Sequence, residues 1–184
     1  AEGRVRHHHF GEGDYDGSER VIQQLLAEAG KAKVAADMVD VKATGAEAAS
    51  NQADVQSPET YVGWQRSQNF VDDKGTVNDA AHTYVAATPR LNEWGLTGNW
   101  TVGAEQAKLN DKDGSIYYRF HARDLHLVLG PGEDGKPVRF QVTVDGKPPG
   151  DGHGVDTDAD GNGTVTGQRL YQLVRETGAV GDHT

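Results

Sequence analysis

Cysteine is absent from the 184 residues, which excludes disulfides, thiolate metal sites and thiol redox chemistry within this chain. No segment reaches the ~18 consecutive apolar residues of a membrane span, so we expect no membrane insertion. Lys and Arg never form a run, and the formal net charge is −10. Because nucleic-acid binding depends on clustered cations, no nucleic-acid partner is expected.

Glycine is abundant, with 24 residues, whereas hydrophobic residues make up only 35% of the chain. This composition is typical of a turn-rich β protein rather than a helix bundle. Asp-Gly pairs between alternating runs are the strongest short-range hairpin signal. Such turn signals occur at Asp73-Lys74-Gly75, Asp113-Gly114, Asp134-Gly135, Asp145-Gly146 and Asp160-Gly161. The fold class predicted is mainly β, with short strands in a sandwich.

The strand patterns refine this prediction. Apolar residues alternate along 115–123 and again along 125–129, but the phase shifts by one residue at Arg123-Asp124. Such a shift indicates a bulge or bend. The run 138–144 alternates cleanly, whereas 170–174 carries apolar residues on both faces, which predicts a strand covered on both sides.

Three zones follow from composition. Residues 1–30 predict a strand at 4–10, a helix that opens near Asp16, and a helix stop at Gly30. Residues 31–56 are rich in Ala, lack aromatic residues and are interpreted as a linker. Residues 57–184 form the predicted β domain.

Several motifs in one order carry a resemblance to a known family. They are the runs 61–70 (YVGWQRSQNF), 119–129 (RFHARDLHLVL), 144–150 (VDGKPPG), 153–156 (HGVD), 161–163 (GNG) and 169–175 (RLYQLVR). Together they resemble the carbohydrate-binding-module-like C-terminal domain of DipZ-type thioredoxin-family proteins of cytochrome c biogenesis. Residues 4–30 are similar to the last strand and helix of the thioredoxin-like domain that precedes it.

The resemblance implies a jelly-roll or galactose-binding-like β-sandwich. It also implies a non-catalytic module for carbohydrate or another polyhydroxylated envelope ligand, located outside the cytoplasm in the periplasm or cell envelope. The Cys-x-x-Cys motif of the redox domain would lie upstream of Ala1, and the family continues past Thr184 with one more strand. We therefore interpret the chain as a fragment or processed product, and expect residues 4–10 to fill the open sheet edge, within the chain or across a homodimer.

Candidate ligand contacts are aromatic side chains, which can stack on sugar faces, and planar polar groups, which can bond hydroxyls. The predicted set is Tyr61, Trp64, Arg66, Asn69, Trp94, Arg119, His121, Arg123 and Asp124. The alternative is that the tryptophans pack the sandwich core and that the polar strand face 119–123 meets solvent.

Two patterns bear on metals. Asp156, Asp158 and Asp160 resemble the first half of a calcium loop, but Gly167 stands where the bidentate Glu of an EF-hand would be, so a solvated acidic turn is the alternative. His7 and His9 would share one face of a strand, without an obvious third ligand. We therefore expect no cofactor, with Ca²⁺ at the acidic loop as the alternative.

No catalytic constellation is recognisable, which argues against an enzyme. His121 or His126 with Asp124 could pair for acid–base chemistry, but such a pair also stabilises a bulge. Two rival functions stay open: a metal-dependent or glycan-acting enzyme, and a structural or protein-interaction domain.

Overall fold

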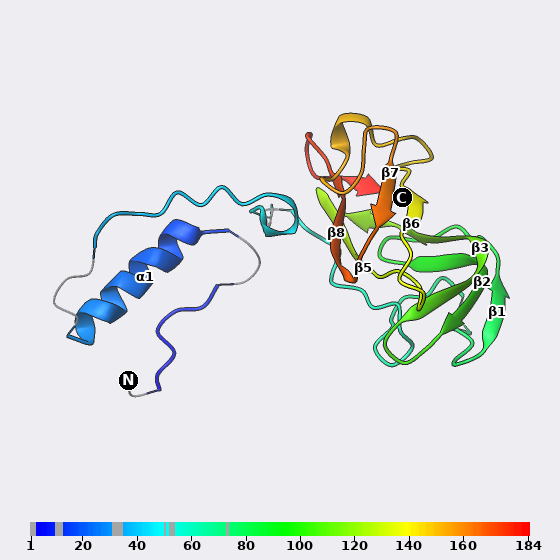
Figure 1. The fold of residues 1–184 in the computed structure, drawn as a ribbon, viewed down its shortest axis with the longest axis horizontal. Helices are drawn as coiled ribbons and strands as arrows, with labels where there is room; N and C mark the ends of the chain where they lie inside the picture. The colour runs from blue at the N-terminus through cyan, green and yellow to red at the C-terminus, as the bar shows by residue number, and fades with distance from the viewer. Residues whose placement is uncertain (1–2, 10–12, 31–34, 50, 52–53, 73) are drawn as a thin grey trace.

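The computed structural model describes residues 3–9, 13–30, 35–49, 51, 54–72 and 74–184. Its elements are α1 (Tyr15–Glu28), η1 (Gly45–Glu47), β1 (Ala81–Tyr84), β2 (Trp94–Val102), β3 (Ala107–Tyr118), β4 (Phe120–His121), β5 (Asp124–Leu129), β6 (Val138–Gln141), η2 (Gly150–Gly152), β7 (Asn162–Val165), β8 (Arg169–Arg175) and β9 (Asp182–His183). The prediction of a mainly β chain is confirmed (Figure 1). Among the described residues, no helix has the length and apolar character that a membrane crossing requires.

The helix α1 forms where the apolar spacing predicts it. The Asp14 side chain caps its start by accepting a hydrogen bond from the Gly17 amide at 3.3 Å, and Gly30 follows its end with φ of 75°. The helix buries none of its residues and lies apart from the sheets in Figure 1. Hydrogen bonds to other segments, such as Gln23 to the Asp37 carbonyl at 3.2 Å and the Val39 amide to Glu19 at 2.8 Å, therefore hold this helix in place of a hydrophobic core.

The strand predicted at 4–10 is wrong for the described residues 3–9, which carry no strand; Phe10 lies outside the described part. Arg6 instead donates two hydrogen bonds to the Glu28 carboxylate, at 2.7 and 3.0 Å. This segment is thereby bonded to α1 and fills no sheet edge within the chain. Residues 35–44 carry neither helix nor strand.

The strand pairings are antiparallel. They comprise a sheet in the order β1-β2-β3 and the pairs β4-β9, β5-β8 and β6-β7. The break predicted at Arg123-Asp124 is confirmed, because β4 ends at His121 and β5 begins at Asp124. The pair β4-β9 places the end of the chain against the residues that precede this break.

The turns predicted at the Asp-Gly pairs are present at some of these pairs and absent at another. Asp145-Gly146 forms the expected two-residue hairpin turn, with φ of 53° and 75° between the paired Val144 and Lys147. Turns also occur at Asp134-Gly135 and Asp160-Gly161, whose Gly amides donate to Gly132 and Asp158 carbonyls. The hairpin predicted at Asp113-Gly114 is wrong: both residues lie inside β3, where the register with β2 shifts between Gly98 and Trp100. Asp73 lies outside the described residues.

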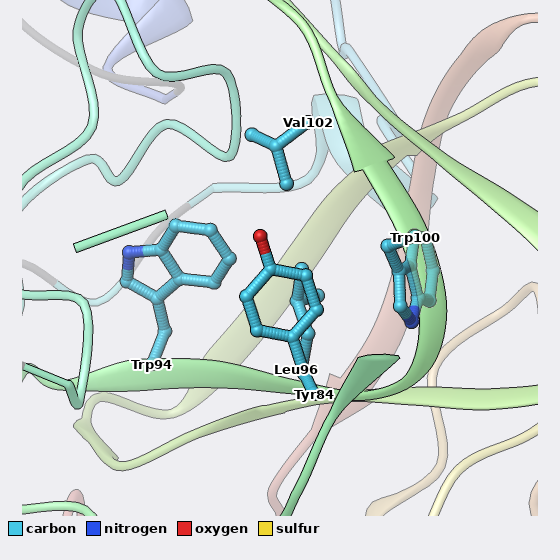
Figure 2. Close-up of a cluster of buried hydrophobic side chains, with 5 residues drawn as sticks. All are labelled: Tyr84, Trp94, Leu96, Trp100 and Val102. Carbon is cyan, nitrogen blue, oxygen red and sulfur yellow. The ribbon is translucent and has the colours of Figure 1, made fainter. Parts of the chain in front are cut away.

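One hydrophobic cluster lies on the β1-β2-β3 sheet. It contains Tyr84, Trp94, Leu96, Trp100 and Val102. Figure 2 shows these side chains converging, with Trp94 and Trp100 on either side of Tyr84. The buried indole N–H groups are satisfied, since Trp94 donates to the Gln68 carbonyl at 2.9 Å and Trp100 to the Thr97 carbonyl at 2.7 Å.

A second cluster forms around β8. Its buried members are Val165, Tyr171, Leu173 and Val174. Residues 171–174 are all buried, so the prediction that this strand is covered on both faces is confirmed. The Tyr171 hydroxyl donates to the Gly167 carbonyl at 2.8 Å and accepts from the Thr166 amide at 3.1 Å, which satisfies its polar atom inside the core.

Candidate functional site

A cleft of about 410 Å³ opens over the segment that precedes β1. It is lined by Pro58, Glu59, Thr60, Tyr61, Gln65, Arg66, Gln68 and Asn69. Three of these, Tyr61, Arg66 and Asn69, belong to the ligand set predicted from the sequence. The structure therefore brings Tyr61, Arg66 and Asn69 together, without Trp64.

The cleft segment is fixed on the β2–β3 turn by main-chain bonds. Trp64 N donates to Gly103 O at 2.9 Å and Gln65 N to Ala104 O at 3.0 Å. Gly63 allows this close approach, because an added Cβ would come within 2.5 Å of the Ala104 carbonyl oxygen. The cleft wall is consequently held by the sheet, although it contains neither helix nor strand.

Charged and aromatic groups meet at one side of the cleft. The Arg66 guanidinium lies 3.6 Å from the Tyr61 ring centroid and donates to the Tyr61 hydroxyl. That hydroxyl in turn donates to a Glu59 carboxylate oxygen at 2.6 Å, and this hydrogen bond raises the pKa of Tyr61. The Glu59 and Arg66 charges offset each other, and the exposed Gln65, Gln68 and Asn69 amides add neutral donors and acceptors.

The two candidate tryptophans lie in different environments. Trp64 is 36% exposed, and its indole N–H donates to Asp79 at 3.1 Å, outside the cleft lining. Trp94 is 1% exposed and packs edge-on against Phe70, at 4.9 Å between ring centroids. Trp94 begins the inward face of β2 and is a core residue. Its predicted role as a ligand contact is therefore wrong.

Arg119 and His121 are bonded to the chain's own carboxylates. Asp182 accepts from Arg119 at 3.2 Å and lies 2.6 Å from His121 Nδ1, while Asp54 lies 3.4 Å from His121 Nε2. Both ring nitrogens face carboxylates, which favours the doubly protonated imidazolium. The hydrogen bond with Asp182 accordingly raises the pKa of His121, and the one with His121 lowers the pKa of Asp182.

Arg123 and Asp124 belong to a second polar group. Asp124 holds Arg123 at 2.7 Å and Arg175 at 3.2 Å, and its own side chain is 11% exposed. A second cavity, of about 530 Å³, lies beside these arginines. Its lining residues are Asn51, Arg123, Asp151, His153, Gly154, Val155, Gln172, Arg175, Glu176, Thr177 and Gly178. Arg119, His121, Arg123 and Asp124 thus do not line the cleft at Tyr61.

Two of the three aspartates of the acidic loop, Asp156 and Asp158, are bonded to different partners. Asp156 forms two bonds with Arg169, at 2.6 and 3.1 Å, and accepts the Gln172 amide at 2.8 Å. Asp158 accepts the Asn162 amide at 2.8 Å. In the part of the chain that the structure describes, no group of three His, Cys, Asp or Glu side chains is placed to hold a metal ion, His7–His9 included. Calcium binding by Asp156, Asp158 and Asp160 stays a prediction.

Sequence reasoning missed several cleft residues, notably Glu59, Thr60 and Gln65. Gln65 lies within the motif 61–70, so its position was available from the sequence. Arg123 is the one lining residue of the cavity beside Arg175 that belongs to the predicted set, because the cavity walls come from segments far apart in the chain and no local pattern marks them.

Comparison with known proteins supports a relation to DipZ-type proteins. Residues 57–184 match the family described as the thioredoxin-like C-terminal domain. Over 151 residues the chain is 30% identical to Protein DipZ of Mycobacterium bovis and to Protein DipZ of Mycobacterium tuberculosis. Each alignment covers 78% of this chain and 21% of the relative, so the chain spans a minor part of those proteins. The chain belongs to the thioredoxin-like C-terminal domain family.

Proposed function

We propose that the β domain is a non-catalytic binding module for carbohydrate or another polyhydroxylated ligand of the cell envelope. We place its binding site in the cleft over residues 58–69. The observation that carries the proposal is the cleft's lining: a tyrosine ring, a guanidinium, a carboxylate and amide groups from Gln65, Gln68 and Asn69. Hydroxyl groups both donate and accept hydrogen bonds, and this lining offers both functions at short spacing.

The charge pattern supports a neutral ligand. Glu59 and Arg66 carry opposite charges in the cleft, and the chain has a net charge of −10. A polyanion would be repelled by this net charge, whereas a neutral glycan would not.

We also propose a fold type, a location and a parent protein for this domain. The sheets form a sandwich of the jelly-roll or galactose-binding-like type, and the antiparallel pairings and two hydrophobic clusters are compatible with it. The domain acts outside the cytoplasm, where a cysteine-free module is unaffected by oxidising conditions. The domain is part of a larger protein that also contains a thiol–disulfide redox domain, in keeping with the relationship to DipZ.

A glycan array followed by NMR titration of the best neutral hit tests the proposal. We expect binding by the native chain, and at least a roughly tenfold loss in the double variant Gln65→Ala/Gln68→Ala, since each hydrogen bond contributes about 1 kcal/mol. Gln168→Ala is the matched control, because Gln168 is an exposed glutamine outside the cleft. Binding that is unaffected by the double variant would move the site elsewhere, and an array without hits would refute the module itself.

A further inference from the structure

Two stretches of the expected linker, residues 45–49 and 54–56, are bound to the β domain. Together with Ser57, the first residue of that domain, they are here called the strap. In Figure 1 the segment with η1 reaches β8, although α1 lies apart from the sheets. Gly45 is buried with φ of 62°, and a Cβ there would come within 2.9 Å of a Val155 methyl. A side chain at position 45 would therefore clash with Val155, and it would also strain the backbone at this positive φ.

A buried amide provides the first anchor. Gln172 on β8 is 0% exposed, and its Nε2 donates to the Gly45 carbonyl at 2.9 Å. Its Oε1 accepts the Val155 amide at 3.3 Å. Without the strap, the Gln172 N–H group would lose its carbonyl partner inside the core, which carries a desolvation cost.

An ion-paired group provides the second anchor. The Ala49 carbonyl accepts from Arg123 at 2.9 Å and from Arg175 at 3.4 Å. Asp124, on the same strand pair, holds both guanidinium groups in place. These donors are thus positioned by the β domain itself, and Arg123, which was predicted to bind a ligand, here holds the chain's own backbone.

The third anchor lies at the entry to the family-matched region. Gln56 N donates to His121 O at 3.1 Å, and Ser57 Oγ accepts from His121 N at 2.7 Å. Asn92 accepts the Ser57 hydroxyl at 2.6 Å and donates to Gln56 O at 3.1 Å. Both ends of the strap are therefore fixed.

The N-terminal segment contacts the strap. The Tyr15 hydroxyl at the start of α1 donates to the Glu47 carbonyl at 2.5 Å, and a Cβ on the buried Gly13 would come within 3.2 Å of the Ala49 methyl. We infer that the strap is an integral part of the β domain and a docking surface for the polypeptide upstream of it. The α1 segment, and any domain continuous with it, is held in one orientation rather than swinging on a flexible linker. This inference is independent of the proposed ligand.

Distance measurement between two spin labels on the full chain tests the inference. Because the chain has no cysteine, Ala27→Cys on α1 and Lys112→Cys on β3 give specific labelling at exposed positions. We expect a single narrow distance distribution. Gly45→Val should remove that peak and leave a broad distribution, because the added side chain displaces the strap from Val155.

The matched control is Gly135→Val, since Gly135 also has a positive φ, of 65°, but an added Cβ there meets nothing within 4 Å. It should keep the narrow peak. Heteronuclear NOE values of the Ala48 and Ala49 amides in the native chain give a second readout that needs no variant, and they should equal those of β8. A broad distribution or low NOE values in the native chain would overturn the inference, as would a Gly45→Val chain that keeps the peak.

Discussion

The placement of Trp94 in the core and Trp64 at the surface predicts very different costs for the same substitution. Trp94 is 1% exposed, packs against Phe70 and donates a hydrogen bond to Gln68. Trp94→Ala removes that contact area and leaves a cavity, so the free energy of unfolding should fall by about 3–5 kcal/mol. At roughly 2–4 °C for each kcal/mol, the melting temperature should fall by about 6–20 °C.

Trp64→Ala is the matched comparison. Trp64 is 36% exposed and makes a hydrogen bond to Asp79, so its loss should cost about 1 kcal/mol or less. Trp94→Phe keeps an aromatic ring beside Phe70 but loses the indole N–H, and should fall between the two. Thermal unfolding followed by circular dichroism measures all three variants. Equal costs at positions 64 and 94 would refute the assignment of Trp94 to the core.

Three further predictions concern titration and close packing. The hydrogen bond with Asp182 raises the pKa of His121, so the contribution of this pair to stability should be fully present below the ordinary pKa of 6.5 and be lost as pH rises through the raised value. An NMR titration of the His121 imidazole with a midpoint at or below 6.5 would contradict this. The Arg169 hydrogen bond lowers the pKa of Asp156, so Asp156→Asn should destabilise the protein by roughly 1–3 kcal/mol at neutral pH. The difference in urea midpoint between this variant and the native chain should vanish as pH falls from 3.8 through the lowered pKa, and a difference that persists in acid would count against the ion pair. Gly154→Ala should prevent stable folding, because its Cβ would overlap the Gln172 carbonyl, whereas Gly167→Ala meets nothing within 4 Å and should leave the melting temperature unchanged or slightly higher; similar melting temperatures for both variants would show that the backbone relaxes around position 154.

The features that the sequence predicted correctly depend on residues adjacent to one another in the chain. The Asp145-Gly146 hairpin and the burial of residues 171–174 on both faces of their strand both follow from local pattern. Asp113-Gly114 carries the same dipeptide signal, but its conformation depends on β2, which lies opposite it across the bulge. Dipeptide chemistry alone cannot reveal such a long-range pairing.

The candidate site likewise contains some contacts between residues close in the chain, which the sequence predicts, and others between distant residues, which it does not. Tyr61, Arg66 and Asn69 lie within nine residues of one another, so a local motif places them in one cleft. His121 contacts Asp54 and Asp182, which are 67 and 61 residues away, and no local pattern reports those contacts. Trp94 was open to better prediction, since 94, 96, 100 and 102 are apolar positions of one strand face.

The two hydrophobic clusters also differ in their optical properties. All three tryptophans precede β3 in the sequence, and two of them belong to the cluster on β1-β2-β3. The cluster around β8 contains Tyr171 and has Phe140 against it, but no indole. Indole-selective fluorescence therefore reports on one half of the domain, and loosening around β8 would be silent in that signal while visible by calorimetry.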